Sequence, residues 1–253
     1  MSEPSAVVPA ARDTLSGLLS GLFGAVLGIA VALGLAILVI PTPTYLALSN
    51  YLQIVTAFAG AGAFLLIYFR YGHQSGYLYA AGAFALWGAS NCAWYLTVLN
   101  GGLAWVFPSL IDIGIIASII LFTSACGRIY QRKPFSGKII LLVLAVSLAI
   151  PVAVIITSGI SNPSLMTLLY FFACGTLIIT ALNHTFAENP LALAGTLLFA
   201  LAFMIYPLRE MFFSGNHYLT IVGLFVAAGF SLIVLGLLPR GAPTPETPQK
   251  VDA

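Results

Sequence analysis

Eight apolar runs, each about 20 residues or longer, restrict the fold of this chain more than any other feature. A helix needs roughly 20 apolar residues to cross the hydrocarbon core of a bilayer. The shorter alternating segments that build a membrane β-barrel are not found. The sequence therefore predicts an all-α, polytopic bundle of eight transmembrane helices. The predicted spans cover residues 15–40, 46–69, 76–99, 108–127, 137–158, 163–184, 190–212 and 218–238.

Composition supports a membrane protein. Hydrophobic residues make up 60% of the chain and charged residues only 6%, and the mean hydropathy is +1.06. A water-soluble domain carries roughly a quarter charged residues. The net charge of +2 is too small to indicate a nucleic-acid partner. Membrane lipid is therefore the expected surrounding of residues 15–239.

The flanking tails and the distribution of cations predict the topology. Residues 1–14 and 240–253 are polar and contain several prolines, so both tails are predicted to be disordered. If the N-terminus is cytoplasmic and eight spans follow, every lysine and arginine except Arg209 falls on the cytoplasmic side. This asymmetry is the one that the positive-inside rule describes. We therefore expect a multi-pass protein of the cell membrane with both termini in the cytoplasm.

Polar caps are predicted at the starts of two spans. Pro41 and Pro43 interrupt the first apolar run, and Ser49 or Asn50 can then cap the second span. Asn189 followed by a proline is a typical start for the seventh span.

A stripe of glycines runs along the first span. Gly17, Gly21, Gly24 and Gly28 repeat at spacings of four, three and four residues, which places them on one helix face. Such a flat face lets another helix approach closely. We expect the stripe to pack inside the bundle or against a second copy of the protein.

Asp112 is the only lone carboxylate inside a long apolar run. One interpretation is structural: Pro108 suits the first position of a new helix, and an acid one turn later meets the positive end of the helix dipole. The other interpretation is functional, because a charge at membrane depth usually has a partner or a role. The sequence leaves both interpretations open.

A possible partner for Asp112 lies near the end of the seventh span. Arg209 and Glu210 follow Tyr206 there, on the same predicted exterior side as Asp112. Neighbouring residues project in different directions from a helix, so Arg209 and Glu210 are not expected to satisfy each other. We expect an Asp112–Arg209 ion pair, with snorkelling of both groups to water as the alternative.

The third span ends in aromatic residues with one amide. Trp87, Asn91 and Tyr95 share a face at helical spacing, and Trp94 lies beside them. An aromatic wall with an amide suits a pocket for a small apolar or cationic molecule. It equally suits an interfacial aromatic belt with one interhelical hydrogen bond. With Asp112, Arg209, Glu210 and Tyr206, the residues Asn91, Trp94 and Tyr95 form the predicted exterior-side cluster.

No metal, cofactor or catalytic group is expected. The three cysteines show no CxxC spacing, and the three histidines lie at span ends or in loops. The spans contain neither paired aspartates nor a zinc-type histidine motif. An intramembrane enzyme is therefore the weakest of the functional alternatives, and we expect a protein that is not an enzyme.

An internal repeat is a further possibility. An offset of about 110 residues aligns Trp94 and Tyr95, a short exterior turn and the fourth span with Tyr206, a short turn and the eighth span. The chain can therefore be divided into two parallel four-helix repeats.

The motif around Asp112 resembles a known group of proteins. An aromatic-rich helix end, a short glycine-containing loop, and then Pro108, Ser109 and Asp112 at the start of a span resemble membrane-embedded sensor regions. In bacteria and archaea such regions precede histidine kinase or diguanylate cyclase domains, in bundles of seven or eight helices. The resemblance implies a sensing or structural role for these three residues and no catalytic one. Those proteins continue into a cytoplasmic signalling domain, whereas only residues 240–253 of this sequence follow the eighth span, so we expect signalling to need a separate partner.

The leading hypothesis is a non-enzymatic membrane module of the sensor or accessory-subunit type. Its exterior-side cluster would bind a small ligand or a partner helix. Its partner would be another membrane or cytoplasmic signalling protein, or a second copy of the chain. The alternative is a small-solute transporter or channel: the inner halves of the spans carry almost no ionisable residue, but a neutral solute needs none.

Overall fold

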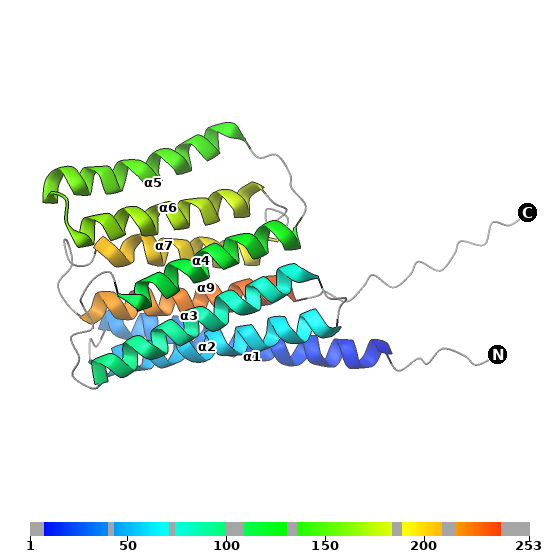
Figure 1. The fold of residues 1–253 in the computed structure, drawn as a ribbon. Helices are drawn as coiled ribbons and strands as arrows, with labels where there is room; N and C mark the ends of the chain where they lie inside the picture. Colours follow the sequence, from blue (N-terminus) through cyan, green and yellow to red (C-terminus); the bar gives the residue numbers. More distant parts are fainter. Residues whose placement is uncertain are drawn as a thin grey trace, which may run out of the picture.

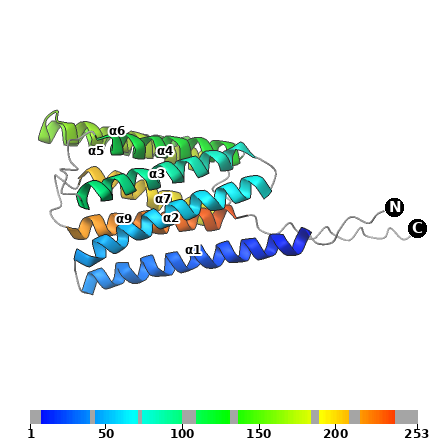
Figure 2. The same cartoon turned by 60° about the horizontal axis from the view of Figure 1, so that its bottom comes forward.

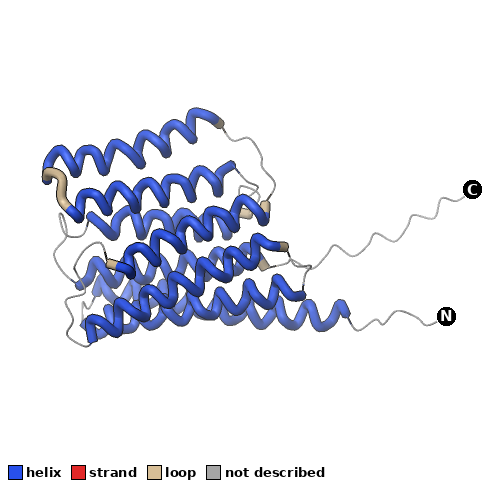
Figure 3. Tube along the Cα trace, viewed as in Figure 1, coloured by secondary structure: helices blue, strands red, loops and turns tan. Residues whose placement is uncertain are grey.

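The computed structural model describes residues 8–39, 43–70, 74–99, 109–130, 136–183, 189–208 and 216–238. Within these ranges the chain forms eight long α-helices and one short 3-10 helix, with no strand (Figures 1 and 3). The elements are α1 (Val8–Val39), α2 (Pro43–Arg70), α3 (Ser75–Leu99), α4 (Leu110–Ile129), α5 (Gly137–Ser158), α6 (Asn162–Asn183), α7 (Pro190–Ile205), η2 (Tyr206–Leu208) and α9 (Asn216–Leu237).

The predicted helical membrane bundle is confirmed. Seven of the helices are long and apolar enough to cross a membrane, and α3 is not among these seven. The protein is thus a multi-pass helical membrane protein. One boundary differs from the prediction: α1 begins at Val8, so residues 8–14, expected to be disordered, continue the first helix.

Consecutive long helices run in alternating directions (Figures 1 and 2). The start of α1 and the end of α9 consequently lie at the same end of the bundle, which we call the proximal end. The starts of α2, α4 and α6 lie at the other end, called the distal end.

The centre of the bundle is filled with aromatic side chains. Phe230 of α9 lies 4.2 Å from Phe84 of α3 and 5.1 Å from Phe199 of α7, measured between ring centroids. The ring of Phe84 also contacts Phe122 of α4. All four side chains are almost fully buried. Because lipid is as apolar as these side chains, close packing rather than exclusion from water holds the helices together.

Helices α1 and α5 lie at the edges of the bundle. The first packs against α9 and α2, whereas α5 packs chiefly against α6 (Figure 1). Only Ser147, Pro151 and Val154 of α5 are buried. Most of the surface of α5 is apolar and exposed, as expected for a helix that faces lipid.

Glycines allow α7 and α9 to approach closely. A Cβ atom placed on Gly195 would lie 2.5 Å from the carbonyl oxygen of Gly229, and one on Gly236 would lie 2.5 Å from the backbone nitrogen of Ala192. Backbones this close leave no room for a side chain, which is the small-residue packing typical of membrane helices.

The glycine stripe of α1 does not take part in such packing. Nothing lies within 4 Å of a Cβ atom placed on Gly17, Gly21, Gly24 or Gly28, and all four residues are exposed. The expectation that the stripe packs inside the bundle is therefore wrong, because α1 presents a different face to α9 and α2. Packing against a second copy remains a prediction.

Side-chain hydrogen bonds join the helices at the proximal end. The amide of Gln74 donates to the carbonyl oxygens of Arg128 and Ile129, at 3.0 and 3.3 Å, and so ties the start of α3 to the end of α4. Asn189 caps α7 by accepting from the backbone N–H of Ala192, as predicted. Its amide also donates to Tyr130 and to the carbonyl of Gly236. This end of the bundle is therefore held by bonds among α3, α4, α7 and α9.

The contacts between helices agree only partly with two repeats. If α1–α4 and α5–α9 are two repeats, α2 corresponds to α6 and α4 corresponds to α9. The pair α4–α6 then corresponds to the pair α9–α2, and the helices of both pairs pack against each other. Helix α1 packs extensively on α9, however, whereas its counterpart α5 packs chiefly on α6. The division into two four-helix repeats remains a prediction.

Candidate functional site

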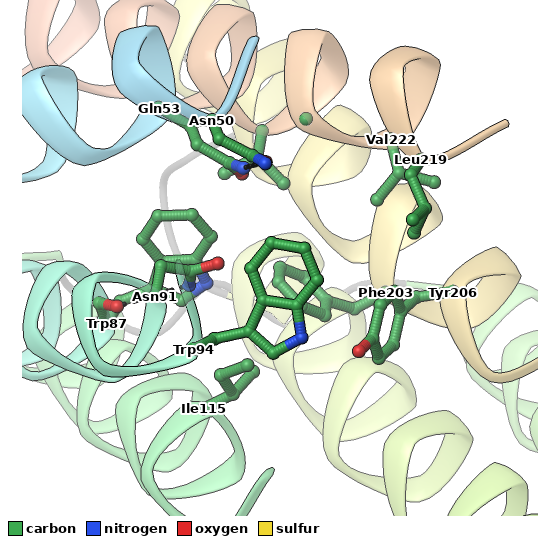
Figure 4. Close-up of a pocket in the computed structure, with 12 residues that line it drawn as sticks. Asn50, Gln53, Trp87, Asn91, Trp94, Ile115, Phe203, Tyr206, Leu219 and Val222 are labelled. Atoms are coloured by element: carbon green, nitrogen blue, oxygen red, sulfur yellow. Dashed lines mark hydrogen bonds between the residues drawn. The ribbon is translucent and has the colours of Figure 1, made fainter. Parts of the chain in front are cut away.

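A pocket lies between α2, α3, α4, α7 and α9 in the distal half of the bundle (Figure 4). The cavity volume is about 40 Å³. A cavity of this volume can hold a few waters or one small molecule. Its lining consists of Asn50, Gln53, Trp87, Asn91, Trp94, Ile115, Phe203, Tyr206, Leu219, Val222, Gly223 and Val226.

Two carboxamides of α2 form the polar part of the lining. Asn50 and Gln53 are each only 6% exposed, and Gln53 Nε2 donates to Asn50 Oδ1 at 2.8 Å. This is the only hydrogen bond that either side chain makes within the part of the chain that the structure describes. The pair therefore leaves one NH₂ group and one carbonyl oxygen available, whichever way the two amides are assigned.

The third carboxamide and two tryptophans come from α3. The amide of Asn91 donates to the carbonyl oxygen of Trp87 at 3.2 Å, which leaves its own side-chain oxygen available. The indole of Trp94 projects into the space between Asn91 and the rings of Phe203 and Tyr206 (Figure 4). The predicted residues Asn91, Trp94 and Tyr206 therefore lie around one pocket.

Trp87 forms part of the wall and is 1% exposed. Its ring meets Phe230 and Phe203 edge to face, with centroids 5.0 and 6.2 Å apart. Its indole N–H is buried and has no hydrogen-bond partner among the described residues. Such a buried, unpaired donor is uncommon and is destabilising unless something binds it.

Gly223 brings α9 close to the carboxamides. A Cβ atom on this glycine would lie 3.1 Å from Ser49 Oγ and 3.2 Å from Gln53 Nε2. A larger residue at position 223 would therefore press on the polar side of the pocket.

Asp112 lies outside the lining, and its carboxylate is fully engaged. Its Oδ2 accepts from the backbone N–H of Ser109 at 3.0 Å and from the Ser109 hydroxyl at 2.6 Å. Ser109 Oγ in turn accepts from the backbone N–H of Asp112, which completes a capping box at the start of α4. Asp112 thus lies in the first turn of α4, as the helix-start interpretation expects, although α4 begins at Leu110 with Ser109 as its cap rather than at Pro108.

A second partner of Asp112 connects it to the pocket. The hydroxyl of Tyr170 on α6 donates to Asp112 Oδ1 at 3.1 Å. The Tyr170 ring stacks on Phe203 with an interplanar angle of 12° and meets Tyr206 edge to face. Because Phe203 and Tyr206 line the pocket, Tyr170 bridges the pocket wall and the cap of α4.

The other predicted residues are Pro108, Arg209, Glu210 and Tyr95. Pro108, Arg209 and Glu210 lie outside the described residues, so the Asp112–Arg209 ion pair stays a prediction. Tyr95 does not line the pocket; its hydroxyl donates to that of Tyr51 at 2.9 Å on an exposed part of α2 and α3.

The predicted cluster did not include most of the pocket lining, in particular the carboxamides of Asn50 and Gln53, or the bridging residue Tyr170. Asn50 was predicted to cap the second span, but α2 begins at Pro43, so Asn50 lies in its second turn and faces the pocket. The spacing of Ser49, Gln53 and Thr56 would have indicated a buried polar stripe, since they recur every three or four residues on an apolar helix. Nothing beyond its position in an apolar run distinguishes Tyr170.

No group of three or more histidine, cysteine, aspartate or glutamate residues that could hold a metal is found among the described residues. Comparison with known proteins gives no relative: no family model, curated protein or solved structure matches the chain. The function must therefore be argued from the pocket itself.

Proposed function

We propose that the protein is a non-enzymatic, eight-span module of the cell membrane, of the sensor or accessory-subunit type. Its distal pocket receives a small ligand from the exterior side, and its proximal end, with both termini, faces the cytoplasm. The observation that carries this proposal is the polar pocket, whose three carboxamides lie among helices that are otherwise apolar. Polar groups at membrane depth are unfavourable and usually serve binding.

The eighth span in this proposal is α3. Its 25 residues extend about 37 Å at 1.5 Å per residue, enough to cross a hydrocarbon core of about 30 Å. It packs along both α2 and α4, which are apolar enough to span. The polar residues that lower its hydropathy include Asn91, which lines the pocket rather than facing lipid.

Occupancy would be transmitted by helix packing. A ligand that displaces Phe203 or Tyr206 alters the ring contacts of Tyr170, and Tyr170 holds the cap of α4 through Asp112. The hydrogen bonds of Gln74 and Asn189 hold the proximal ends of the helices together, so that α4 would tilt about this end when its distal end moves. The helices would thus have two packing arrangements, one with the pocket empty and one with it occupied. A ligand can shift the balance between them only by its difference in affinity for the two arrangements. A signalling protein at the cytoplasmic side, or a second copy of the chain, would detect the shift.

A pocket-filling substitution tests this proposal without a ligand. Gly223→Leu places a side chain against Gln53 and so mimics an occupied pocket, while Gly223→Ala is the milder version. Spin labels on Ser75 of α3 and Asn183 of α6, near the proximal end, report the distance between the two helices after the native cysteines are replaced. We expect a change of about 2 Å or more with Gly223→Leu.

The matched control is Gly82→Leu, since nothing lies within 4 Å of a Cβ atom on Gly82. It should leave the distance unchanged. Unchanged distances in both Gly223 variants, with both proteins folded, would contradict the sensor proposal.

A small-solute transporter or channel is the second candidate. It is favoured by the uncharged polar lining, because a neutral solute needs hydrogen-bonding groups and no ionisable ones. Uptake of radiolabelled acetamide into proteoliposomes distinguishes the two candidates. A flux that Gly223→Leu abolishes and Gly82→Leu preserves would favour transport.

A further inference from the structure

We infer that the ligand of the distal pocket is a small uncharged molecule, or the uncharged end of a larger one, that both donates and accepts a hydrogen bond. Amides, ureas and alcohols belong to this class. The inference rests on the proposed function, since it names the ligand class of the same pocket. It departs from the sequence-based expectation of an apolar or cationic ligand.

The first argument is the charge of the lining. None of the twelve described residues that line the pocket is charged. The nearby carboxylate of Asp112 is not among them, and it already accepts from Ser109 and Tyr170. An ion entering the pocket would lose its hydration and meet no opposite charge among the described lining residues, which strongly disfavours binding.

The second argument is the hydrogen-bonding capacity that the lining leaves over. The bond between Asn50 and Gln53 uses one donor group and one acceptor. One NH₂ group and one carbonyl oxygen of this pair remain, and the side-chain oxygen of Asn91 adds a second acceptor. A ligand that only accepts would leave these oxygens unpaired, and a ligand that only donates would leave the NH₂ group unpaired.

The third argument is size and shape. The cavity volume of about 40 Å³ admits a ligand of only a few heavy atoms, or the small end of a larger ligand. The flat faces of Trp94 and Phe203 suit a planar group of this size (Figure 4).

Four probes of nearly identical shape test the class. Acetamide is uncharged and both donates and accepts, acetone only accepts, acetate is an anion and acetamidinium is a cation. Binding to the protein in lipid nanodiscs is followed by the NMR signals of ¹⁵N-labelled indole groups, because Trp87 and Trp94 line the pocket. Single Trp→Phe variants assign the signals, including that of Trp105.

We expect a saturable shift with acetamide. Acetone should bind at least about tenfold more weakly, because the acceptors of the pocket then stay unpaired. Acetate and acetamidinium should bind at least about a hundredfold more weakly. Equal binding of either ion would overturn the ligand class while leaving a ligand-binding pocket in place. The absence of a saturable shift with all four probes would also overturn the ligand class. The proposed function would then be tested separately, by the distances between spin labels in the Gly223 variants.

Substitutions of one residue sharpen the test. Gln53→Leu should weaken acetamide binding at least about tenfold, since it removes half of the polar pair. Gln53→Glu should reverse the preference toward acetamidinium, which a merely structural role of Gln53 does not predict. The control is Ser231→Ala, because Ser231 is buried on α9 outside the pocket and bonds only its own helix, at the carbonyl of Ala227. Unchanged probe affinities in both Gln53 variants would refute the inference.

Discussion

The hydrogen bond between Tyr170 and Asp112 allows a quantitative prediction. Tyr170→Phe removes the hydroxyl that donates to Asp112 Oδ1 at 3.1 Å and keeps the ring that packs on Phe203 and Tyr206. A hydrogen bond to a charged group contributes about 1.5 to 3 kcal/mol in soluble proteins, whereas interhelical bonds in membranes average about 0.6 kcal/mol. We therefore expect Tyr170→Phe to lower the free energy of unfolding by about 1 to 2 kcal/mol.

Asp112→Ala should be more harmful. It removes the carboxylate half of the capping box with Ser109, which is worth about 1 kcal/mol, and leaves the Tyr170 hydroxyl buried without its acceptor. The expected loss is about 2 to 4 kcal/mol. Because both single changes break the same bond, the double variant should be less destabilised than the sum of the two by about 0.5 to 2 kcal/mol.

The assay is reversible unfolding in mixed micelles for the four proteins of the cycle. Tyr95→Phe is the matched control, because its hydroxyl bonds that of Tyr51 on an exposed part of the bundle. We expect a change below about 0.5 kcal/mol for this control. Additive losses in the Asp112–Tyr170 cycle, or a loss in Tyr95→Phe as large as in Tyr170→Phe, would refute the reasoning.

Three further predictions concern packing, the proximal end and topology. Gly236→Ala should lower the unfolding free energy by about 1 to 3 kcal/mol, because its Cβ would lie 2.5 Å from the backbone nitrogen of Ala192; Gly82→Ala, in open space, should not. Asn189→Ala should cost about 1 to 3 kcal/mol in the same assay, since it removes a helix cap and bonds to α9 and Tyr130. A cysteine replacing exposed Ser136 should react with a membrane-impermeant thiol reagent only in inside-out vesicles; reaction from the outside would invert the proposed topology.

The positions of the helices follow from the sequence because the bilayer imposes a simple length rule. Seven of the eight helices begin within about three residues of the predicted starts, and α5 matches its predicted range of 137–158. The start of α1 differs because the prediction ends the helix where polar residues begin, whereas a helix can extend beyond the hydrocarbon core into water.

The candidate site was less accessible to sequence reasoning, since it depends on which faces of distant helices meet. The aromatic residues and the amide at the end of α3 directed the prediction to Asn91 and Trp94, which line the pocket, but their binding role stays a prediction. The capping box at Asp112 was also predictable, because it is formed within four residues. Gln53 and Tyr170 were missed: one requires the packing of α2 on α9, and the other requires α6 to lie beside α4. No local pattern contains these pairings.

The central claim is that the carboxamides of Asn50 and Gln53 serve a ligand rather than the fold. The most direct test is the unfolding free energy of Asn50→Leu/Gln53→Leu. Replacing both partners of a buried hydrogen bond by apolar groups of similar size is close to neutral or stabilising, whereas Gln53→Leu alone leaves Asn50 unpaired. We predict that the double variant is as stable as the natural protein within about 0.5 kcal/mol, or more stable, and no longer binds acetamide. A loss of more than about 2 kcal/mol would contradict the account, because the pair would then be part of what holds the helices together.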